Sequence, residues 1–348
     1  MLKQKIMPTE AVEVREIFKS CKNVVICTHT SPDGDAIGSS LALAEFLKRK
    51  GKSATVIVPN YFPDFLKWMN GADCIMLYDR QRGLANSFIG MADLICCLDF
   101  NSLSRIDELG EAVAHSRAKK LMIDHHLSPD RFCDVTISRP EVSSTCELLY
   151  RVFDAIGATQ HVNLHCAEDL YAGMCTDTGG FTYNSNDPDI FLIISELMRK
   201  GIDKDLIYRK IYNNYTVDRY RLMGYILYEK LEVFPDTHSS IFHLTKEDLK
   251  RFHYLKGDAE GVVNMPLCIK GQKLSISLRE DTDKPLVWVS LRSVDDFPCN
   301  RMAEEFFNGG GHLNAAGGKL SCSVDEALEI AKRAIEAYRD MLCDAQPQ

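Results

Sequence analysis

The sequence predicts an α/β protein with a doubly wound, mostly parallel sheet, followed by a smaller α/β domain and joined to it by a helical connector. In the first half of the chain, short β-branched runs alternate with helical stretches, which is typical of a parallel sheet. Helical patterns dominate from about 187 to 231, and short alternating strands follow after about 238. We therefore expect domains at 1–190 and 238–348, with the connector at 191–237.

The elements of the first domain follow from apolar runs bounded by turn residues. A helix capped by Thr9, with Val12, Ile17 and Phe18 on its inner side, is expected to come first. The predicted strands are 23–28, Thr55–Val58, Cys74–Tyr78, Leu94–Leu98 and Leu121–Ile123. The predicted helices among and after them are Ala36–Lys50, Ser143–Ile156 and Asn163–Cys175.

The second domain shows shorter strands and a glycine-rich segment. Gly309–Gly318 precedes a last helix that is expected to begin near Val324. Glycine permits tight turns and close approach of two backbones, so this segment is a candidate for either packing or ligand binding. The predicted strands are Ser240–Leu244, Leu267–Ile269, Leu274–Leu278 and Leu286–Leu291.

Composition limits the classes of function. The 348 residues suffice for two domains, and a formal net charge of −8 argues against a protein that coats duplex nucleic acid. No apolar run approaches the roughly 20 residues that a membrane helix needs, and the first residues lead into an amphipathic segment. Thirteen cysteines without a Cys-x-x-Cys pair indicate reduced thiols. We expect a cytoplasmic protein without membrane contact.

The first chemical motif follows the first predicted strand. His29, Asp33 and Asp35 lie on one short loop that also holds a Ser-Pro turn. Such a loop could be a turn with Asx caps and a surface histidine. It could equally contribute to a metal site, because one imidazole and two carboxylates suit divalent cations. The motif alone leaves both interpretations open.

Other acidic and histidine residues follow other predicted strands and helices. Asp99 comes after the fourth strand, Asp124, His125 and His126 come after the fifth, and Asp177 comes two residues after the predicted helix Asn163–Cys175. Each alone could be an ordinary turn residue. The carboxyl ends of parallel strands converge on one crevice, however, so these residues can meet. Oxygen and imidazole donors without thiolates favour manganese or magnesium, and two such ions polarise a phosphoryl oxygen and lower the pKa of a water molecule.

These motifs carry a family resemblance. His-x-x-x-Asp-x-Asp, the lone Asp99, Asp124-His125-His126 and Thr176-Asp177-Thr178-Gly179 resemble the DHH phosphoesterase superfamily. Gly-Gly-Gly-His-x-x-Ala-Ala-Gly, starting at Gly309, resembles the DHH-associated C-terminal domain. The motifs span nearly the whole chain in the family's order. The chain is most similar to the bifunctional oligoribonuclease (nanoRNase) and pAp phosphatase group.

The resemblance implies roles for the individual residues. Two divalent ions would bind. Manganese is the favoured metal for both, and magnesium and cobalt are the alternatives. His126 would contact the phosphate or protonate the leaving oxygen, and Asp124 would orient a histidine. The implied ligands are His29 and Asp33 for the first ion, Asp35, His125 and Asp177 for the second, and Asp99 as the bridge.

The resemblance also implies a phosphate site in the second domain. His312 and the preceding glycines Gly309, Gly310 and Gly311 would bind a terminal phosphate, and Arg292 resembles the family's phosphate-binding arginine. A structural glycine turn and an ordinary surface arginine are the alternatives. No Gly-Lys-Ser/Thr follows the glycines, which argues against a nucleotide triphosphatase loop.

The expected function is a metal-dependent phosphodiesterase. Its substrates would be short single-stranded RNA or linear dinucleotides such as pApA, cleaved to 5′-mononucleotides, with pAp as a further substrate. A homodimer is compatible with this expectation. The alternatives are a RecJ-like single-strand DNA exonuclease, whose chains typically carry a further domain, and a non-enzymatic nucleotide sensor, which would not need all six ligands.

Overall fold

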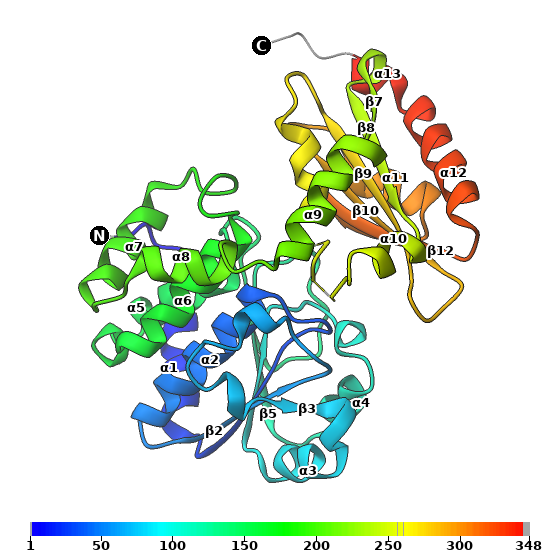
Figure 1. Ribbon diagram of the computed structural model, residues 1–348. Coiled ribbons are helices and arrows are strands. Elements are labelled where there is room, and N and C mark those ends of the chain that lie inside the picture. Colours follow the sequence, from blue (N-terminus) through cyan, green and yellow to red (C-terminus); the bar gives the residue numbers. More distant parts are fainter. Residues whose placement is uncertain (1, 256, 260, 344–348) are drawn as a thin grey trace. The chain divides into compact units, whose positions relative to one another are not determined.

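The structure is a computed structural model that describes residues 2–255, 257–259 and 261–343. The chain forms two compact units, Met1–Asn214 and Tyr215–Gln348 (Figure 1). Each unit has its own six-stranded sheet and two hydrophobic clusters of its own. The boundary between the units falls inside the range 191–237, so the helices of that range divide between the two units.

The first unit is built on an entirely parallel sheet in the order β3-β2-β1-β4-β5-β6. Its strands are β1 (Asn23–Cys27), β2 (Ser53–Val58), β3 (Met76–Leu77), β4 (Leu94–Leu98), β5 (Lys119–Asp124) and β6 (Val135–Ser138). The chain builds outward from β1 in one direction and from β4 in the other. The topological switch point therefore lies where β1 pairs with β4. Open α/β sheets bind ligands beyond the carboxyl ends of the strands at such a point.

Helices cover both faces of this sheet, which makes it doubly wound as the sequence predicts. Successive side chains of β1 point to opposite faces, so Val24 and Ile26 join one core and Val25 and Cys27 join the other. Figure 1 shows α3 and α4 on the face away from α1 and α2. The first face carries α1 (Pro8–Ser20), α2 (Gly34–Arg49), α5 (Thr145–Ala155), α6 (Leu164–Asp177), α7 (Pro188–Arg199) and α8 (Lys204–Tyr212). The second carries α3 (Tyr78–Met91) and α4 (Leu109–His115).

The second unit has a mixed sheet in the order β11-β12-β10-β9-β8-β7, in which only β8 and β9 run parallel. Its strands are β7 (Glu232–Phe234), β8 (Ser239–Leu244), β9 (Leu274–Glu280), β10 (Val287–Ser293), β11 (Gly310–His312) and β12 (Ala315–Leu320). Its helices are α9 (Val217–Tyr225), the π-helical turn Ile226–Lys230, α10 (Lys246–Arg251), α11 (Cys299–Phe306), α12 (Val324–Ala337) and α13 (Arg339–Cys343). Val287, Val289 and Leu291 of β10 pack in one core with residues of α11 and α12.

Two predicted elements differ in the structure. Leu267–Ile269 was expected as a strand, but Val262–Cys268 forms a 3₁₀ helix. Pro266 lies within that turn and has no N–H for a sheet ladder, which disfavours a strand there. The strand expected at Cys74–Tyr78 shrinks to β3, because Ala72–Cys74 forms a 3₁₀ turn and Tyr78 begins α3.

The first helix also begins differently from the prediction. Met7 rather than Thr9 is the N-cap, since Pro8 occupies the first helical position. Ile17 and Phe18 are buried as expected, whereas Val12 is 55% exposed and the prediction for it was wrong. Residue 11 takes the inward position instead, because Ala11 lies three residues before the buried Val14.

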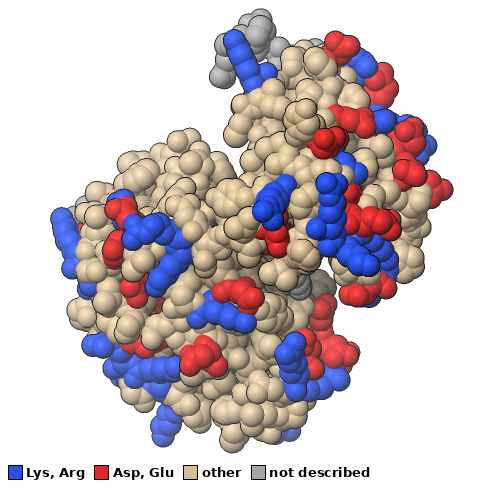
Figure 2. Space-filling view, viewed as in Figure 1, with Lys and Arg blue, Asp and Glu red and all other residues tan. Residues whose placement is uncertain are grey.

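The surface is mixed in charge. Acidic and basic side chains are interspersed on the face shown in Figure 2, and neither kind covers a large area there. Within the described ranges, no helix is both long and apolar enough to span a lipid bilayer.

Candidate metal centre

Three strands deliver polar residues to the switch point of the first unit. His29 comes two residues after β1, Asp99 directly follows β4, and His125 directly follows β5. Cys27 of β1 pairs with Cys97 of β4, so these strand ends lie level with each other. The parallel register therefore explains why residues about a hundred positions apart in sequence meet.

The first group of donors contains His29, Asp33 and Asp99, whose ligand atoms lie within 4.8 Å of one another. The His29 Nε2 is 3.4 Å from Asp99 Oδ2 and 3.8 Å from Asp33 Oδ2. The His29 Nδ1 lies 2.9 Å from the carbonyl oxygen of Thr30. An Nδ1–H that donates to this carbonyl leaves Nε2 as the basic nitrogen, which is how metal-binding histidines are usually oriented.

The two interpretations of Asp33 turn out to be compatible. Its Oδ1 caps α2 by accepting from the backbone N–H groups of Asp35 and Ala36, both at 3.0 Å. Its Oδ2 is the oxygen that faces His29. Because the two roles use different oxygens, the Asx cap positions the carboxylate for a metal ion rather than competing with one.

The second group of donors contains Asp35, His125 and Asp177, again within 4.8 Å of one another. The His125 Nε2 is 3.4 Å from Asp177 Oδ2 and 3.6 Å from Asp99 Oδ1. Asp35 comes from the first turn of α2, and Asp177 is the last residue of α6. The structure thus brings together all six residues expected as ligands.

Asp99 lies between the two groups. Its Oδ2 is the atom nearest His29 and its Oδ1 is the atom nearest His125. Burial opposes ionisation of this carboxyl, which is 2% exposed, yet His29 and His125 hold its pKa below the usual range. The backbone at Asp99 has φ of 62°, a left-handed conformation that few non-glycine residues adopt. An unusual backbone at this position fits a functional constraint.

The electrostatics of the group favour divalent cations. Burial and the charge of Asp99 raise the pKa of Asp35 to about 7. Burial, together with the charges of Asp35 and Asp33, raises the pKa of Asp177 well above its usual range. Burial would lower the pKa of His29, but Asp99 and Asp33 outweigh it and raise that pKa to about 9. These carboxylates repel one another, and hard divalent ions relieve such repulsion while accepting oxygen and imidazole ligands.

Asp124 and His126 form a pair beside the six ligands. The Asp124 carboxylate is fully buried, and its Oδ1 lies 2.7 Å from His126 Nδ1. Its Oδ2 accepts the backbone N–H of His126 at 3.1 Å. Two contacts from one carboxylate fix both the backbone and the ring of His126. The ring also approaches Asp99, with 3.7 Å between Nδ1 and Asp99 Oδ1.

The sequence did not reveal which groups hold the carboxylates in place. Asp35 accepts the backbone N–H of Thr145 at 2.6 Å and that of Cys146 at 2.9 Å. The Thr145 hydroxyl donates to Asp99 Oδ1 at 2.9 Å. A Cβ at Gly173 would lie 2.9 Å from Asp35 Oδ1, so a glycine is needed on that side. The only sequence pattern at this place is Ser-Ser-Thr at the start of the predicted helix. It predicts a helix cap but not which residues the helix N-terminus faces.

The candidate phosphate residues of the second unit lie in one row of its sheet. Arg292 of β10 pairs with Ala315 of β12, and Ala315 pairs with His312 of β11. Directly paired residues share a face of the sheet, so the arginine and the histidine flank a small alanine, about 10 Å apart at the strand spacing. His312 is exposed and Arg292 is half-buried.

The glycines before His312 have different surroundings. A Cβ at Gly309 would overlap the Gly317 carbonyl, and one at Gly311 would lie 2.5 Å from the Ala315 carbonyl oxygen. Gly310 has open space, with Glu304 atoms 3.8 Å away or more. Close packing of β11 on β12 thus accounts for two of the three glycines. Only Gly310 lacks a steric reason within the fold.

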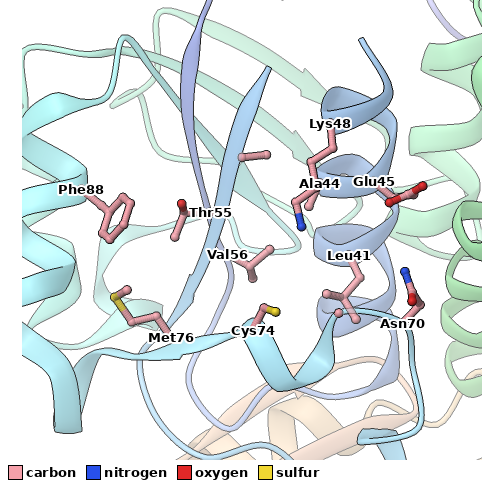
Figure 3. Close-up of a pocket in the computed structure, with 12 residues that line it drawn as sticks. Leu41, Ala44, Glu45, Lys48, Thr55, Val56, Asn70, Cys74, Met76 and Phe88 are labelled. Carbon is pink, nitrogen blue, oxygen red and sulfur yellow. The ribbon is translucent and has the colours of Figure 1, made fainter. Parts of the chain in front are cut away.

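A pocket of about 250 Å³ in the first unit lies apart from these residues (Figure 3). Leu41, Val56, Met76 and Phe88 give it a largely apolar lining, and Lys48 lies at its side. None of the predicted site residues lines it. The pocket is therefore separate from the predicted site residues at the carboxyl edge of the sheet.

Comparisons with known proteins find relatives that match most of the chain. A crystal structure of an exopolyphosphatase-related protein from Bacteroides fragilis is 52% identical, covers 98% of this chain and 99% of that chain, and superposes with a TM-score of 0.95. The bifunctional oligoribonuclease and PAP phosphatase NrnA of Thermus thermophilus is 27% identical, over 95% of this chain and 94% of that protein. The structure of RecJ from Thermus thermophilus in complex with Mn²⁺ shares the fold at 13% identity, covering 96% of this chain and 54% of that chain, with a TM-score of 0.52.

Family matches cover both units. Residues 23–174 match the DHH family, N-terminal domain, and residues 249–337 match the DHHA1 domain. The first range contains five of the six candidate ligands, and the second contains the glycine-rich strand β11 and Arg292. The chain therefore belongs to the DHH family of phosphoesterases and carries both a DHH and a DHHA1 domain.

Proposed function

We propose that the protein is a two-metal phosphodiesterase that cleaves short oligoribonucleotides or linear dinucleotides such as pApA to 5′-mononucleotides and also dephosphorylates pAp. The observation that carries the proposal is the pair of donor groups that share Asp99 at the switch point of the parallel sheet. Two adjacent cation sites with a common carboxylate are the arrangement that in-line displacement at phosphorus uses. The named activity of the Thermus relative gives the substrate class.

The chain's own residues would hold and neutralise the cations. His29, Asp33 and Asp99 would bind the first ion, and Asp35, His125 and Asp177 the second, with Asp99 shared. When bound, the ions polarise the phosphoryl oxygen and lower the pKa of a water molecule. Manganese fits this mixture of carboxylate and imidazole donors, and magnesium fits it less well.

The Asp124–His126 pair supplies a proton-handling group. Asp124 accepts at His126 Nδ1, which leaves Nε2 as the nitrogen that can exchange a proton. A histidine fixed in this way can donate to the oxygen that leaves phosphorus, or hydrogen-bond a phosphate oxygen in the bound substrate. The buried position of Asp124 keeps the ring in one orientation through the reaction.

In the second unit, Arg292 and His312 would bind a terminal phosphate of the substrate. Their shared face of the sheet and the alanine between them leave room for an anion, and a guanidinium suits bidentate contact with phosphate oxygens. The open side of Gly310 would let backbone approach the same group. Recognition of a terminal phosphate would make short substrates the preferred ones.

A substrate panel with Mn²⁺ tests the proposal. We would measure hydrolysis of pApA, a five-nucleotide RNA, pAp, a twenty-nucleotide single-stranded DNA and pyrophosphate, with the Asp99→Asn variant as the control for contaminating nucleases. We expect turnover of pApA and the short RNA, release of 5′-mononucleotides, and slower phosphate release from pAp. All of these should stop in the variant.

Other outcomes would identify the rival functions. Preference for the long DNA would indicate a RecJ-like exonuclease, and consumption of pyrophosphate alone would contradict the nanoRNase proposal. Tight binding of these ligands without hydrolysis by a manganese-loaded protein would indicate a nucleotide sensor.

A further inference from the structure

The first turn of α5 grips two of the metal-site carboxylates at once. The backbone N–H groups of Thr145 and Cys146 each donate to a different oxygen of Asp35, at 2.6 and 2.9 Å. The Thr145 hydroxyl donates to Asp99 Oδ1 at 2.9 Å. Thr145 and Cys146 are fully buried, so no solvent competes for these bonds. The position of this turn therefore sets where Asp35 and Asp99 lie.

One buried acid, Glu147, holds this first turn of α5 in place. Its backbone N–H donates to the Ser144 hydroxyl, the N-cap contact of α5, at 3.0 Å. Its Oε2 accepts from both the backbone N–H and the hydroxyl of Ser143, at 2.8 and 2.7 Å. Glu147 thus contacts the N-cap residue Ser144 through its backbone and the preceding Ser143 through its side chain. These two residues come directly before Thr145 and Cys146, which contact the metal-site carboxylates.

The other carboxylate oxygen of Glu147 is tied to elements far away in the sequence. Its Oε1 accepts from Arg151 Nε at 2.7 Å. The Nη1 of Arg151 donates to Asp189 Oδ2 of α7 at 3.2 Å and to the carbonyl of Lys3 at 3.1 Å. The backbone N–H of Lys3 donates to the same Asp189 oxygen at 2.6 Å. Glu147 is 0% and Arg151 3% exposed, so the ion pair at the centre of the network is shielded from solvent.

Stability alone is a weak reason for such a network. Desolvating an ion pair costs several kcal/mol, and apolar residues of the same volume often stabilise a core as well or better. What an ion pair with several fixed hydrogen bonds adds is a defined geometry for the groups it contacts. The contacts that Glu147 fixes lead within one turn to Asp35 and Asp99.

We propose that Glu147, held by Arg151, is a positioning residue for the metal centre: it fixes the Ser143–Cys146 turn and thereby the placement of Asp35 and Asp99. This inference rests on the proposed two-metal site. Glu147, which makes no contact with the metal ligands, would thus contribute a measurable share of the affinity for metal ions. Groups that hydrogen-bond metal ligands directly typically contribute 10–100-fold to metal affinity or activity, and Glu147 acts through such groups, the donors of Thr145 and Cys146.

The principal test compares Glu147→Gln with Glu10→Gln. Glutamine has one acceptor oxygen, so it cannot accept from Ser143 and from Arg151 together. Glu10 also pairs with an arginine in the same unit, Arg139, but does not contact the Ser143–Cys146 turn. Mn²⁺ affinity would be measured without substrate, from the electron paramagnetic resonance signal of free Mn²⁺. We expect about 10–100-fold weaker binding for Glu147→Gln and unchanged binding for Glu10→Gln.

A second pair of variants probes the turn itself and avoids any change of buried charge. Thr145→Val removes the hydroxyl that donates to Asp99 and keeps the shape of the side chain, whereas Thr145→Ser keeps the hydroxyl. We expect Thr145→Val to weaken Mn²⁺ binding and Thr145→Ser to restore it. For both weakened variants, excess Mn²⁺ should recover much of the lost kcat with pApA, while KM for pApA stays unchanged.

The possible failures are distinguishable. Wild-type Mn²⁺ affinity in Glu147→Gln would overturn the positioning role of Glu147 and leave the metal centre intact, whatever the affinity of Thr145→Val. If Glu147→Gln does not fold, the comparison of Thr145→Val with Thr145→Ser decides, and equal affinities in that pair would overturn the proposal. No Mn²⁺ binding by the unaltered protein would overturn the metal centre itself. Mn²⁺ binding without hydrolysis of any nucleotide would contradict the proposed phosphodiesterase activity and leave the metal centre and its positioning open to the same affinity measurements.

Discussion

The two units use six-stranded sheets in opposite ways. In the first unit the candidate functional residues come from strand ends and helix ends that meet at the carboxyl edge of a parallel sheet. In the second unit Arg292 and His312 lie on strands and are aligned by direct pairing with Ala315. A parallel edge gathers residues from distant parts of the sequence, whereas a ladder aligns residues from neighbouring strands. The first arrangement can build a dense buried cluster, and the second builds a row along an accessible face.

The charges of the two sets differ accordingly. The first unit gathers carboxylates whose burial and mutual repulsion raise the pKa of Asp35 and Asp177. The second unit presents a guanidinium and an imidazole beside glycine and alanine. Carboxylates attract metal ions that take part in the reaction, and cationic side chains attract the phosphate of the substrate. Changes in the first unit should therefore alter kcat, and changes in the second should alter KM.

The largest expected effect is at Asp99. Asp99→Asn and Asp99→Ala remove the charge shared by the two donor groups, and we expect kcat for pApA to fall by about 10³-fold or more, equivalent to several kcal/mol. The fold should persist, which circular dichroism would confirm. Asparagine tolerates the left-handed backbone better than alanine, so Asp99→Asn should be the more stable variant. Near-normal turnover in either variant would refute the shared role.

The second largest expected effect is that of metal removal, which should destabilise the first unit and not the second. A ligand at a hundred times its Kd stabilises the native state by about 2.7 kcal/mol. Chelation should therefore lower the melting temperature, and hydrogen exchange should rise near Asp35 and the start of α5 while β10 and β12 stay protected. The Asp99→Asn variant is the control, because its melting temperature should respond less to chelation. Equal loss of protection in both units would contradict a site confined to the first.

Arg292→Ala and His312→Ala test the second unit. A hydrogen bond to a charged group contributes about 1.5–3 kcal/mol, so each variant should raise KM for pApA roughly 10–100-fold with little change in kcat. Arg333→Ala on the exposed side of α12 is a matched control, since α12 packs on the sheet face that carries the core. A kcat defect with an unchanged KM would remove the phosphate-binding role.

The smallest expected effect concerns acid response. Asp169 of α6 is fully buried, no donor in the described chain reaches either of its oxygens, and burial raises its pKa well above 3.8. The folded state thus binds a proton that the unfolded state releases above about pH 4, so this residue lowers stability as pH rises. Asp169→Asn should match the wild type near pH 4 and be more stable by roughly 1–2 kcal/mol at pH 8. Urea unfolding at both pH values measures this.

The second unit offers the opposite sign for comparison. The Trp288 indole N–H and the backbone amide of Asp283 lower the pKa of Asp281 to about 2. Its stabilisation is present above about pH 4 and is lost as pH falls toward 2. Asp281→Asn should therefore reduce the acid sensitivity of stability. The change in the free energy of unfolding should have opposite signs in Asp169→Asn and Asp281→Asn and should depend on pH. A change of the same sign in both variants, as large at pH 8 as at pH 3, would contradict the assignment.

The parallel sheet, and the meeting of the candidate ligands at its edge, could be predicted because both depend on local patterns. Runs such as Leu94–Leu98 fix the strands, and topology then brings their ends together. The short strands β6, β7, β11 and β12 were not predicted. In β11 and β12 the reason is composition: glycine and alanine carry little strand preference, and only the close packing around Gly309 and Gly311 makes these segments pair.

The interactions that hold the site in place could not be predicted. Glu147 and Arg151 have the spacing of an ordinary helical ion pair, and only the fold shows that they are buried and tied to Lys3 and Asp189. The Ser-Ser-Thr cap likewise indicated where a helix begins but not that its first amides face Asp35. Hydrogen bonds across more than a hundred residues leave no periodic trace in the sequence.

The left-handed backbone at Asp99 has a consequence for how the gene can vary. Asparagine and glycine are the other residues that accept this conformation readily, and each is one base change from an aspartate codon. The substitutions that the backbone tolerates best are thus among the easiest to reach by mutation, and both discard the shared carboxylate. Under the proposed two-metal mechanism, selection at this codon would therefore act on catalysis rather than on folding. Inactive, well-folded alleles should arise here more readily than at the other ligand codons.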